Sequence, residues 1–559
     1  MRVLNPNTKQ ILKEIESMNP EEAVNSLMSI LRSAESWESK VKVVELLLKF
    51  QDNHKLSLQE FKTVFLEDRH PQLRLALIDL IAKFYVKDGI YFLKDQYKNC
   101  SDGTVRRNLI EVVGKIDLND SIPFFIEALS DTNIESKKLA VNFLGKTGKK
   151  EAIVPLIELL HFRNAELYDL LIDAIVRLGK KGNLDTIYEY SNTEDPNIKR
   201  EIPVVLGKIG DKQSEDLLIL NLKDTNPSVR KNSVKALEKI IELKNIKHIL
   251  DLLDDPEKDV RKEVIRVLGN VGSKRAVKPL LDILKEKDIR FRNLTRNALY
   301  KILSKSKTYD LLYEVLKGRN LYARKEVIKL VGMLKDYEAI DLLIKTFNSK
   351  VASIRSSAYK AILEILDRKP DDLIISGLEH NSWQVRMYCV RILGEIGDSN
   401  TIDAIFNLLE DDNGSVRKAA ISSLVNFESD KLINVANQAI KSTNWKHRRT
   451  GVKLIINIGG NDSVKSLISC LNDDDIYIKS WAAMALGKLK NIESIDPFIS
   501  LLKETDDKIR LSAVKALGEI GNKEAINPLI EILGDDNWDV RKEIEIALNK
   551  INPDWMKSL

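Results

Sequence analysis

Lysine and arginine return along this chain at a fixed spacing, and they are the residues best placed to do chemistry. In units such as Val260-Arg261…Gly269 and Ile509-Arg510…Gly518, an apolar residue precedes a base, and a glycine follows the base by eight positions. The pattern restarts about every 31 residues from Lys42 to Arg541, with one unclear position near Tyr168. We call these bases the ladder. Guanidinium and ammonium groups form charge-assisted hydrogen bonds with carboxylates and phosphates, so the ladder predicts repeated contacts with acidic groups.

Residues that could support catalysis or hold a cofactor lack the spacing that those functions need. The six histidines form no HxxxH or HExxH pair, and Cys100, Cys389 and Cys470 form no CxxC motif. The glycines follow the repeat spacing and form no phosphate-binding loop. We therefore predict that the protein is not an enzyme and uses no metal or other cofactor.

Bulk properties exclude other classes of protein. The net charge is only +5 over 559 residues, so an electrostatic function depends on how charge is arranged. No apolar run approaches the ~20 residues that cross a bilayer, and the start of the sequence does not resemble a secretory signal. The three cysteines are far apart in sequence, which fits a reducing compartment. These features predict a soluble, cytoplasmic protein without a membrane partner.

One unit of the repeat shows which elements must position the bases. In residues 504–534, apolar residues from Ile509 to Ile520 have the spacing of an amphipathic helix, which Gly521-Asn522 ends. A second helical stretch follows, and no strand pattern is present. The sequence therefore predicts an all-α fold, an α-solenoid of about 17 helical hairpins in an armadillo-like superhelix. We expect divergent capping repeats at residues 1–70, the solenoid at 71–551 and a tail at 552–559.

The repeat resembles the HEAT repeat, and within that superfamily the short HEAT-like type of phycobilin lyases. The shared marks are a proline in the first helix, such as Pro155 or Pro528, and an aspartate six residues before a ladder base, such as Asp131 or Asp535. We expect the aspartate to cap the following helix and to pair with the ladder base of a neighbouring repeat, which makes the ladder structural. The resemblance implies that the second helix lines the concave surface. Deoxyhypusine hydroxylase is an enzyme built from HEAT-type repeats, and it binds iron through repeated His-Glu pairs. No histidine of this sequence is followed by glutamate, which argues against that activity.

A second set of bases lies on the outward face of the second helix. Counted from the ladder base as 0, positions +1, +5 and +9 form one stripe, which carries 23 bases and four acids in the 14 units of clear register. Position +5 is the most informative, because the family often has glutamate there. Its bases are the predicted partner-binding residues Lys235, Arg266, Lys329, Lys360, Arg391, Lys453 and Lys515. Two interpretations remain open: a basic groove for an acidic partner, or a solvated helix face.

Tryptophans accompany this stripe in the C-terminal half. Trp383, Trp445 and Trp538 each lie three residues before a ladder base, and Tyr388 and Trp481 lie beside the stripe. The three tryptophans are candidate anchors for a peptide or an unpaired nucleobase. The alternative is that each one covers the first turn of its own helix.

The repeat is irregular at residues 285–336, which hold 14 bases and six acids. Tyr300 replaces the usual glycine there. The candidate binding residues of this basic segment are Arg290, Arg292, Arg296, Lys301, Lys305 and Lys307. The segment is predicted to be either a concentrated binding zone or a bend in the solenoid.

The leading functional hypothesis is a scaffold or adaptor that grips an acidic protein or protein complex in a basic concave face. The first alternative is a nucleic-acid-binding HEAT-repeat protein, which the stripe would also suit. The second is a phycobilin-lyase-like subunit. Partner identity and oligomeric state remain open.

Overall fold

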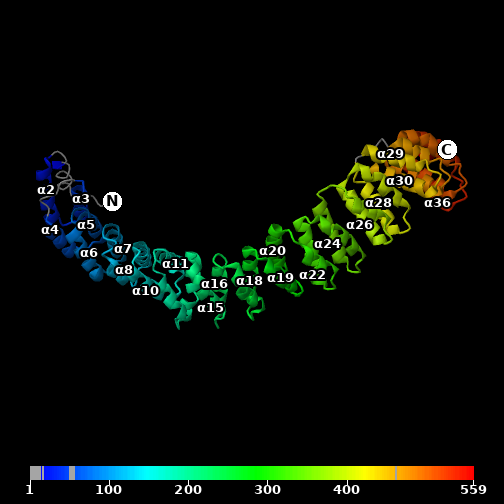
Figure 1. The fold of residues 1–559 in the computed structure, drawn as a ribbon. Coiled ribbons are helices and arrows are strands. Elements are labelled where there is room, and N and C mark those ends of the chain that lie inside the picture. Colours follow the sequence, from blue (N-terminus) through cyan, green and yellow to red (C-terminus); the bar gives the residue numbers. More distant parts are fainter. Residues whose placement is uncertain (1–13, 16–17, 50–56, 428, 460–462, 559) are drawn as a thin grey trace. The chain divides into compact units, whose positions relative to one another are not determined.

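The computed structural model describes residues 14–15, 18–49, 57–427, 429–459 and 463–558. Within these ranges all regular secondary structure is helical, and no strand is present (Figure 1). The chain divides into two compact units, Met1–Ser273 and Lys274–Leu559. Because residues 1–13, 16–17 and 50–56 lie outside the described ranges, the predicted capping segment 1–70 is described only in part. No helix of the described part is long and apolar enough to span a bilayer.

The helices pair into successive antiparallel hairpins, and we call the two members of a hairpin its A helix and its B helix. The first unit contains these hairpins: α2 (Pro20–Ser33) with α3 (Trp37–Leu47), α4 (Leu58–Glu67) with α5 (Pro71–Phe84), α6 (Val86–Asn99) with α7 (Gly103–Ile116), α8 (Ile122–Ala128) with α9 (Ile134–Thr147), α10 (Ile153–Leu159) with α11 (Ala165–Gly179), α12 (Leu184–Glu189) with the broken helix α13 (Pro196–Lys199) and α14 (Ile202–Ile209), α15 (Glu215–Asn221) with α16 (Pro227–Leu237), and α17 (Lys247–Leu250) with α18 (Lys258–Val271).

The second unit repeats the same arrangement. Its hairpins are α19 (Val277–Ile283) with α20 (Ile289–Ser306), α21 (Asp310–Lys317) with α22 (Leu321–Leu334), α23 (Ile340–Lys345) with α24 (Ala352–Leu366), α25 (Asp372–Ser376) with α26 (Trp383–Ile396), α27 (Ile402–Asn407) with α28 (Gly414–Leu424), α29 (Ser429–Ile440) with α30 (Trp445–Ile458), α31 (Val464–Cys470) with α32 (Ile476–Lys488), α33 (Ile495–Leu501) with α34 (Asp507–Ile520), and α35 (Ile526–Glu531) with α36 (Trp538–Ile551). The described residues thus contain 17 hairpins, which confirms the predicted all-α solenoid.

Ladder bases join many of the repeats to the next one. Arg106 Nε and Nη2 donate to the two carboxylate oxygens of Asp131 at 2.9 and 2.8 Å, while Nη1 donates to the backbone oxygens of Cys100 and Ser101. The same fork forms in four further pairs: Arg230–Asp255, Arg386–Asp411, Arg448–Asp473 and Arg510–Asp535. At the unclear position, Tyr168 donates its hydroxyl proton to buried Glu201 instead. The predicted pairing of ladder bases with turn aspartates is confirmed at these sites.

The prediction that the same aspartate caps the following helix is wrong. Asp131 Oδ1 accepts from the backbone N–H of Asn133, which closes the turn before α9. Asn133 is the N-cap, and its side chain accepts from the N–H groups of Glu135 and Ser136. The aspartate lies too far before the helix to reach those donors, so capping passes to the residue two positions later.

The glycine of the repeat marks the place where neighbouring B helices touch. A Cβ atom on Gly487 of α32 would lie 2.8 Å from the Cα atom of Ala516 on α34, and a Cβ atom on Gly518 would lie 2.8 Å from the Cβ atom of Ala547 on α36. Contacts this short leave no room for a side chain. The glycine therefore permits the close approach of one B helix to the next.

The ladder is interrupted near the start of the second unit. Gly318, Ser349 and His380 occupy three successive positions where other repeats have the aspartate. Arg324 Nε is buried without a hydrogen-bond partner among the described residues, and burial lowers the pKa of its guanidinium. These repeats therefore lack the ion pair that joins repeats elsewhere.

Candidate functional site

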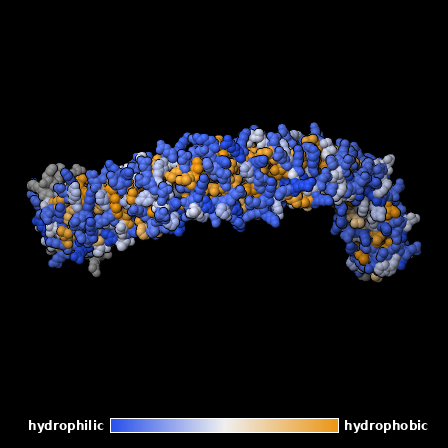
Figure 2. Space-filling model, turned by 60° about the horizontal axis from the view of Figure 1, so that its bottom comes forward, coloured by the Kyte–Doolittle hydropathy of each residue, from blue (hydrophilic) through white to orange (hydrophobic). Residues whose placement is uncertain are grey.

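The B helices carry the predicted stripe, and most of its +5 bases are exposed. Lys235, Lys360, Arg391, Lys453 and Lys515 are exposed, while Arg266 and Lys329 are half-buried. Figure 2 shows one face of the molecule, which is mainly hydrophilic with smaller hydrophobic areas. Whether a stripe base can attract a partner depends on the acids around it.

Acids of the first unit neutralise most of its stripe. Seven of the eleven stripe bases in this unit lie within 4.0 Å of a carboxylate oxygen. Arg266 is the clearest case, because Nη2 lies 2.6 Å from Glu238 and 2.7 Å from Glu263. The hydrogen bonds that Arg266 donates to Glu263, together with the one it donates to Glu238, raise the pKa of Arg266 despite burial. Stripe bases held in this way offer little net charge to a ligand.

The stripe of the second unit keeps its charge. Ion pairs hold Lys329, Arg449 and Lys550, whose partners are Glu326, Asp475 and Glu519. Eight other bases have no carboxylate within 4.0 Å in the part of the chain that the structure describes: Lys325, Lys360, Arg391, Lys418, Lys453, Lys488, Lys515 and Lys542. Ion pairs therefore hold a smaller share of the stripe bases in the second unit than in the first, although three of the four stripe acids, Glu364, Glu395 and Glu519, also lie in the second unit.

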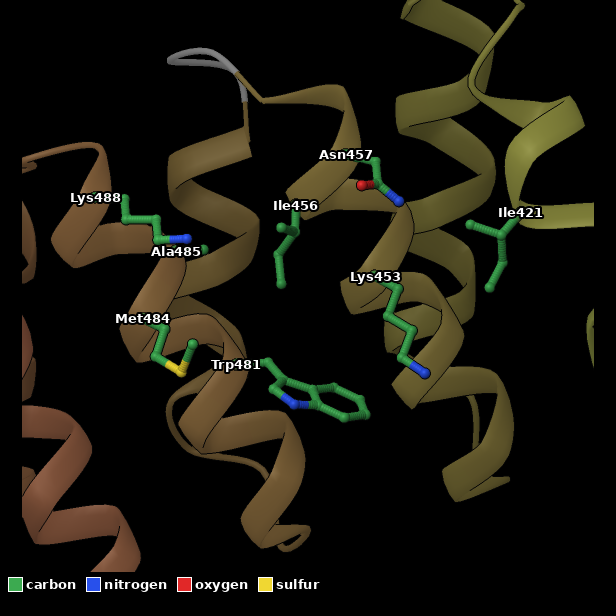
Figure 3. Close-up of a pocket in the computed structure, with 8 residues that line it drawn as sticks. All are labelled: Ile421, Lys453, Ile456, Asn457, Trp481, Met484, Ala485 and Lys488. Carbon is green, nitrogen blue, oxygen red and sulfur yellow. The ribbon is translucent and has the colours of Figure 1, made fainter. Parts of the chain in front are cut away.

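Two adjoining hollows lie on this face, over α28, α30 and α32, and Figure 3 shows the residues that line the first of them. We call them together the Trp481 groove, because Lys453 and Trp481 line both. The first hollow, of about 380 Å³, is largely apolar, and Ile421, Ile456 and Met484 contribute to its wall. The second, of about 340 Å³, is polar; its wall contains the bases Arg417, Lys446 and Arg449 and the acids Glu410, Asp411 and Asp412.

Lys453 is the central charge of the Trp481 groove. Its Nζ lies 4.6 Å from the centre of the Trp481 ring, a cation–π contact. Although the side chain of Lys453 is exposed by surface area, the protein around it partly excludes water, which lowers its pKa, and the nearby positive charges of Arg449 and Arg417 lower that pKa further. A carboxylate bound beside Lys453 would relieve this repulsion.

Arg449 is held in place by several partners at once. Its Nε and Nη2 donate to the carboxylate of Asp475 at 2.8 and 3.0 Å. Its guanidinium also stacks 4.5 Å from the Trp445 ring and 4.4 Å from the Tyr477 ring. These contacts hold the guanidinium of Arg449 in the wall of the polar hollow.

The predicted tryptophans differ in position. Trp445, 48% exposed, lines the polar hollow, whereas Trp538, 62% exposed, stacks against Lys542 of its own helix. Trp383 is 37% exposed and lines neither hollow of the Trp481 groove. Of the two residues beside the stripe, Tyr388 is buried against Phe347, while Trp481 is central to the groove. The sequence signal for Trp481 was its place at +2, beside the bases.

The structure does not bring the six bases of the irregular segment together. Arg292 is 8% exposed and donates to the backbone oxygens of Glu286 and Lys287, while Arg296 pairs with Glu326. Arg290, Lys301, Lys305 and Lys307 are exposed at other positions on α20 or just after it. The helix α20 continues to Ser306, and its C-cap residue Lys307 adopts a left-handed φ of 48°. Of the six, Arg296 lines a separate hollow together with Lys329 and Lys360.

Within the described ranges, no three His, Cys, Asp or Glu side chains are grouped to hold a metal ion. All three cysteines are buried and free.

Comparisons with known proteins place the repeat in a family. The family model described as HEAT repeats matches residues 90–168, 184–259, 215–300, 246–320, 372–451, 433–513 and 495–554. No curated protein matches the chain. Among solved structures, the crystal structure of Kap121p is 12% identical with a TM-score of 0.36, covering 99% of this chain and 86% of that chain. Human deoxyhypusine hydroxylase in complex with glycerol is 16% identical with a TM-score of 0.20, covering 62% of this chain and 99% of that chain. Likenesses this distant carry no argument about what the chain binds or does.

Proposed function

The chain belongs to the HEAT-repeat family, and on this premise we propose that it is a non-catalytic scaffold or adaptor that binds an acidic segment of a protein partner. The binding surface is the B-helix stripe of the second unit, centred on the Trp481 groove. By the resemblance to other HEAT repeats, this stripe lies on the concave side. An extended array of repeats suits contacts with a partner at many points.

The observation that carries the proposal is the uncompensated charge around Lys453. This lysine has no carboxylate within 4.0 Å in the described residues, and partial burial together with the charges of two neighbouring arginines lowers its pKa. Complementary charge on a partner would both steer its approach and relieve this repulsion. The apolar hollow beside Lys453 offers space for one apolar side chain of the same segment.

The groove favours an acidic peptide over a nucleic acid. Three acids line the polar hollow: Asp412, Glu410 beside His447, and Asp411, whose charge Arg386 balances. Asp412 and Glu410 would repel a continuous phosphate backbone. A peptide can place carboxylates beside Lys453 and Arg417 and uncharged residues beside these acids. Trp481 then packs against an apolar side chain instead of stacking on a nucleobase.

Fluorescence anisotropy tests the proposal. The probes are labelled Asp/Glu-rich peptides with one leucine, single-stranded and duplex oligonucleotides, and a Lys-rich peptide, each at two salt concentrations. We expect the acidic peptide to bind and the Lys-rich peptide not to bind. Oligonucleotide binding that collapses at the higher salt, without peptide binding, would instead establish the nucleic-acid alternative.

Charge reversal locates the surface. The triple variant Lys360→Glu, Arg391→Glu and Lys453→Glu should weaken acidic-peptide binding at least about tenfold, because it reverses the uncompensated charges. The matched control, Lys231→Glu, Lys235→Glu and Lys239→Glu, makes the same charge change on stripe positions of the first unit. Equal losses in both variants would show that overall charge, not this surface, determines binding.

Finer predictions from the sequence remain proposals. They are the domain limits 1–70, 71–551 and 552–559, the cytoplasmic location, and the phycobilin-lyase-like alternative, which bilin transfer would reveal.

A further inference from the structure

A third hollow, of about 480 Å³, lies on the stripe face of the second unit over α20, α22 and α24. We call it the serine hollow; its lining is Arg296, Lys325, Lys329, Met333, Ser353, Ser356, Ser357, Lys360, Ala361 and Glu364. We propose that the serine hollow binds a phosphorylated serine or threonine of the acidic partner segment. This inference rests on the proposed function and specifies the chemistry of its ligand.

The charges of the serine hollow match a phosphate monoester. Its four bases face one lining acid, Glu364, and a second acid, Glu326, which lies behind the surface at 2% exposure. Glu326 is shared, because it pairs with Arg296 and lies 3.0 Å from Lys329 Nζ. The balance is an excess of about two positive charges, and a phosphate monoester carries about −1.5 to −2 at neutral pH. A single carboxylate would leave part of this excess uncompensated.

Several hydrogen-bond donors of the hollow lack an acceptor. Arg296 Nε is buried without a hydrogen-bond partner among the described residues. Ser353 and Ser356 are exposed, and in the described part of the chain neither hydroxyl has a hydrogen-bond partner. Lys325 and Lys360 are likewise without a carboxylate within 4.0 Å there. A phosphate offers three acceptor oxygens, so it can accept hydrogen bonds from a guanidinium, from ammonium groups and from hydroxyls at the same time.

The start of α24 adds a weaker favourable effect. Val351 is the N-cap of this 15-residue helix and cannot accept a hydrogen bond through its side chain. Ser353 and Ser356 lie in the first turns after it. The partial positive charge of an uncapped helix start favours an anion near these serines.

The lining argues against a nucleic acid as the source of the phosphate. No lining residue is aromatic, so a nucleobase would find no stacking surface. The four bases surround one hollow instead of following a line, which suits one dianion better than a row of backbone phosphates. Met333 and Ala361 offer apolar contact to the flanking peptide.

Paired peptide libraries test the inference with the full-length chain. One labelled library holds Asp/Glu-rich peptides with a fixed central phosphoserine, and its partner library has serine at that position. We expect the phosphorylated library to bind at least about tenfold more tightly, because charge-assisted hydrogen bonds to phosphate replace unpaired donors. Equal affinity of the two libraries would overturn the inference and leave the proposed function standing. Binding of neither library would overturn the proposed function itself.

Two variants assign the effect to the hollow. Lys325→Gln with Lys360→Gln removes the two uncompensated lysines and should abolish the preference for phosphoserine, so that both libraries bind this variant with one equal, weaker affinity. Lys453→Gln, in the Trp481 groove, should weaken both libraries by the same factor. A phosphoserine preference that survives the double variant would place the phosphate elsewhere and refute the assignment. Free phosphoserine that competes as well as the phosphopeptide would show that only the phosphate group, and no peptide, is recognised.

Discussion

Replacing Asp131 with asparagine should destabilise the first unit, because Asp131 accepts from four donors in a water-free position. Its side chain is 0% exposed, and it accepts from Arg106 at 2.8 and 2.9 Å, from the Tyr97 hydroxyl at 2.6 Å and from the Asn133 N–H at 2.7 Å. Burial alone would raise the pKa of Asp131. The hydrogen bonds from Arg106, Tyr97 and Asn133 outweigh burial and lower that pKa from 3.8 to about 2.

This shift sets the magnitude of the effect. A pKa lowered from 3.8 to about 2 corresponds to roughly 2 kcal/mol of folding stability. Asp131→Asn also leaves the guanidinium of Arg106 partly buried without a counter-charge, and breaking such a pair typically costs about 3–5 kcal/mol. We therefore expect a loss of about 3 kcal/mol at pH 7.

The pH dependence has a definite sign. The folded-state pKa lies below the unfolded value, so the stabilisation is complete above pH ~4 and is lost as the pH falls toward 2. Near pH 3 about half of the ionisation contribution remains, so the difference between the wild type and Asp131→Asn should narrow there.

Hydrogen exchange of the α7 and α9 amides at pH 7 would measure the local opening free energy, and urea unfolding at pH 7 and pH 3 would give the pH dependence. The control is Asp173→Asn, which breaks the exposed 3.0 Å pair with Lys208 and should cost less than about 1 kcal/mol. A cost below about 1 kcal/mol for Asp131→Asn, or one that does not change between pH 7 and pH 3, would refute the view that this buried fork stabilises the repeats.

Three further predictions concern packing and chemistry. Gly487→Ala should lower the midpoint of urea unfolding, because the new Cβ would lie 2.8 Å from the Ala516 Cα. The control Gly534→Ala should leave that midpoint nearly unchanged, because no atom lies within 4 Å of its new Cβ. Ser349→Asp should restore the missing ladder pair with Arg324 and raise stability by about 1–2 kcal/mol, whereas a lower melting temperature would count against this reasoning. Burial raises the pKa of the Cys389 and Cys470 thiols to about 12. Neither thiol should therefore react with a thiol reagent at pH 8 until urea unfolds the chain, and rapid labelling of the folded chain would contradict their burial.

The fold could be predicted from the sequence because the same helical spacing of apolar residues recurs in many repeats. Ile509, Ala513 and Leu517 lie on one face of α34, as their spacing predicts, and all are buried. Asp131 shows where such reasoning stops. Asp131 and Asn133 both precede α9, and both residue types are good N-caps, so the sequence does not choose between them. The backbone path of the turn places Asn133 at the cap position.

The site was harder to predict than the fold, because ion pairing across repeats is not visible in sequence. Arg266 and Lys453 occupy the same +5 position, yet Arg266 is held by Glu238 of the preceding repeat while Lys453 meets two arginines. The serine hollow depends on the same effect. Ser356 is a neutral position of the stripe and Ser353 lies outside it, and their value as donors follows only from the bases that α20 and α22 bring beside them.

The glycine contacts between B helices also fix the distance between successive stripe positions of the second unit. Helices that touch in this way lie about 8–10 Å apart, so each stripe position recurs with that pitch from one repeat to the next. A peptide in the polyproline II conformation advances about 3.1 Å per residue and turns once every three residues, so every third side chain faces the same side and three residues span about one repeat. A ligand with an acidic residue at every third position would stay in step with successive B helices, and one with acids at every second position would drift out of step. Affinity would then depend on the periodicity of acids along the ligand as much as on their number.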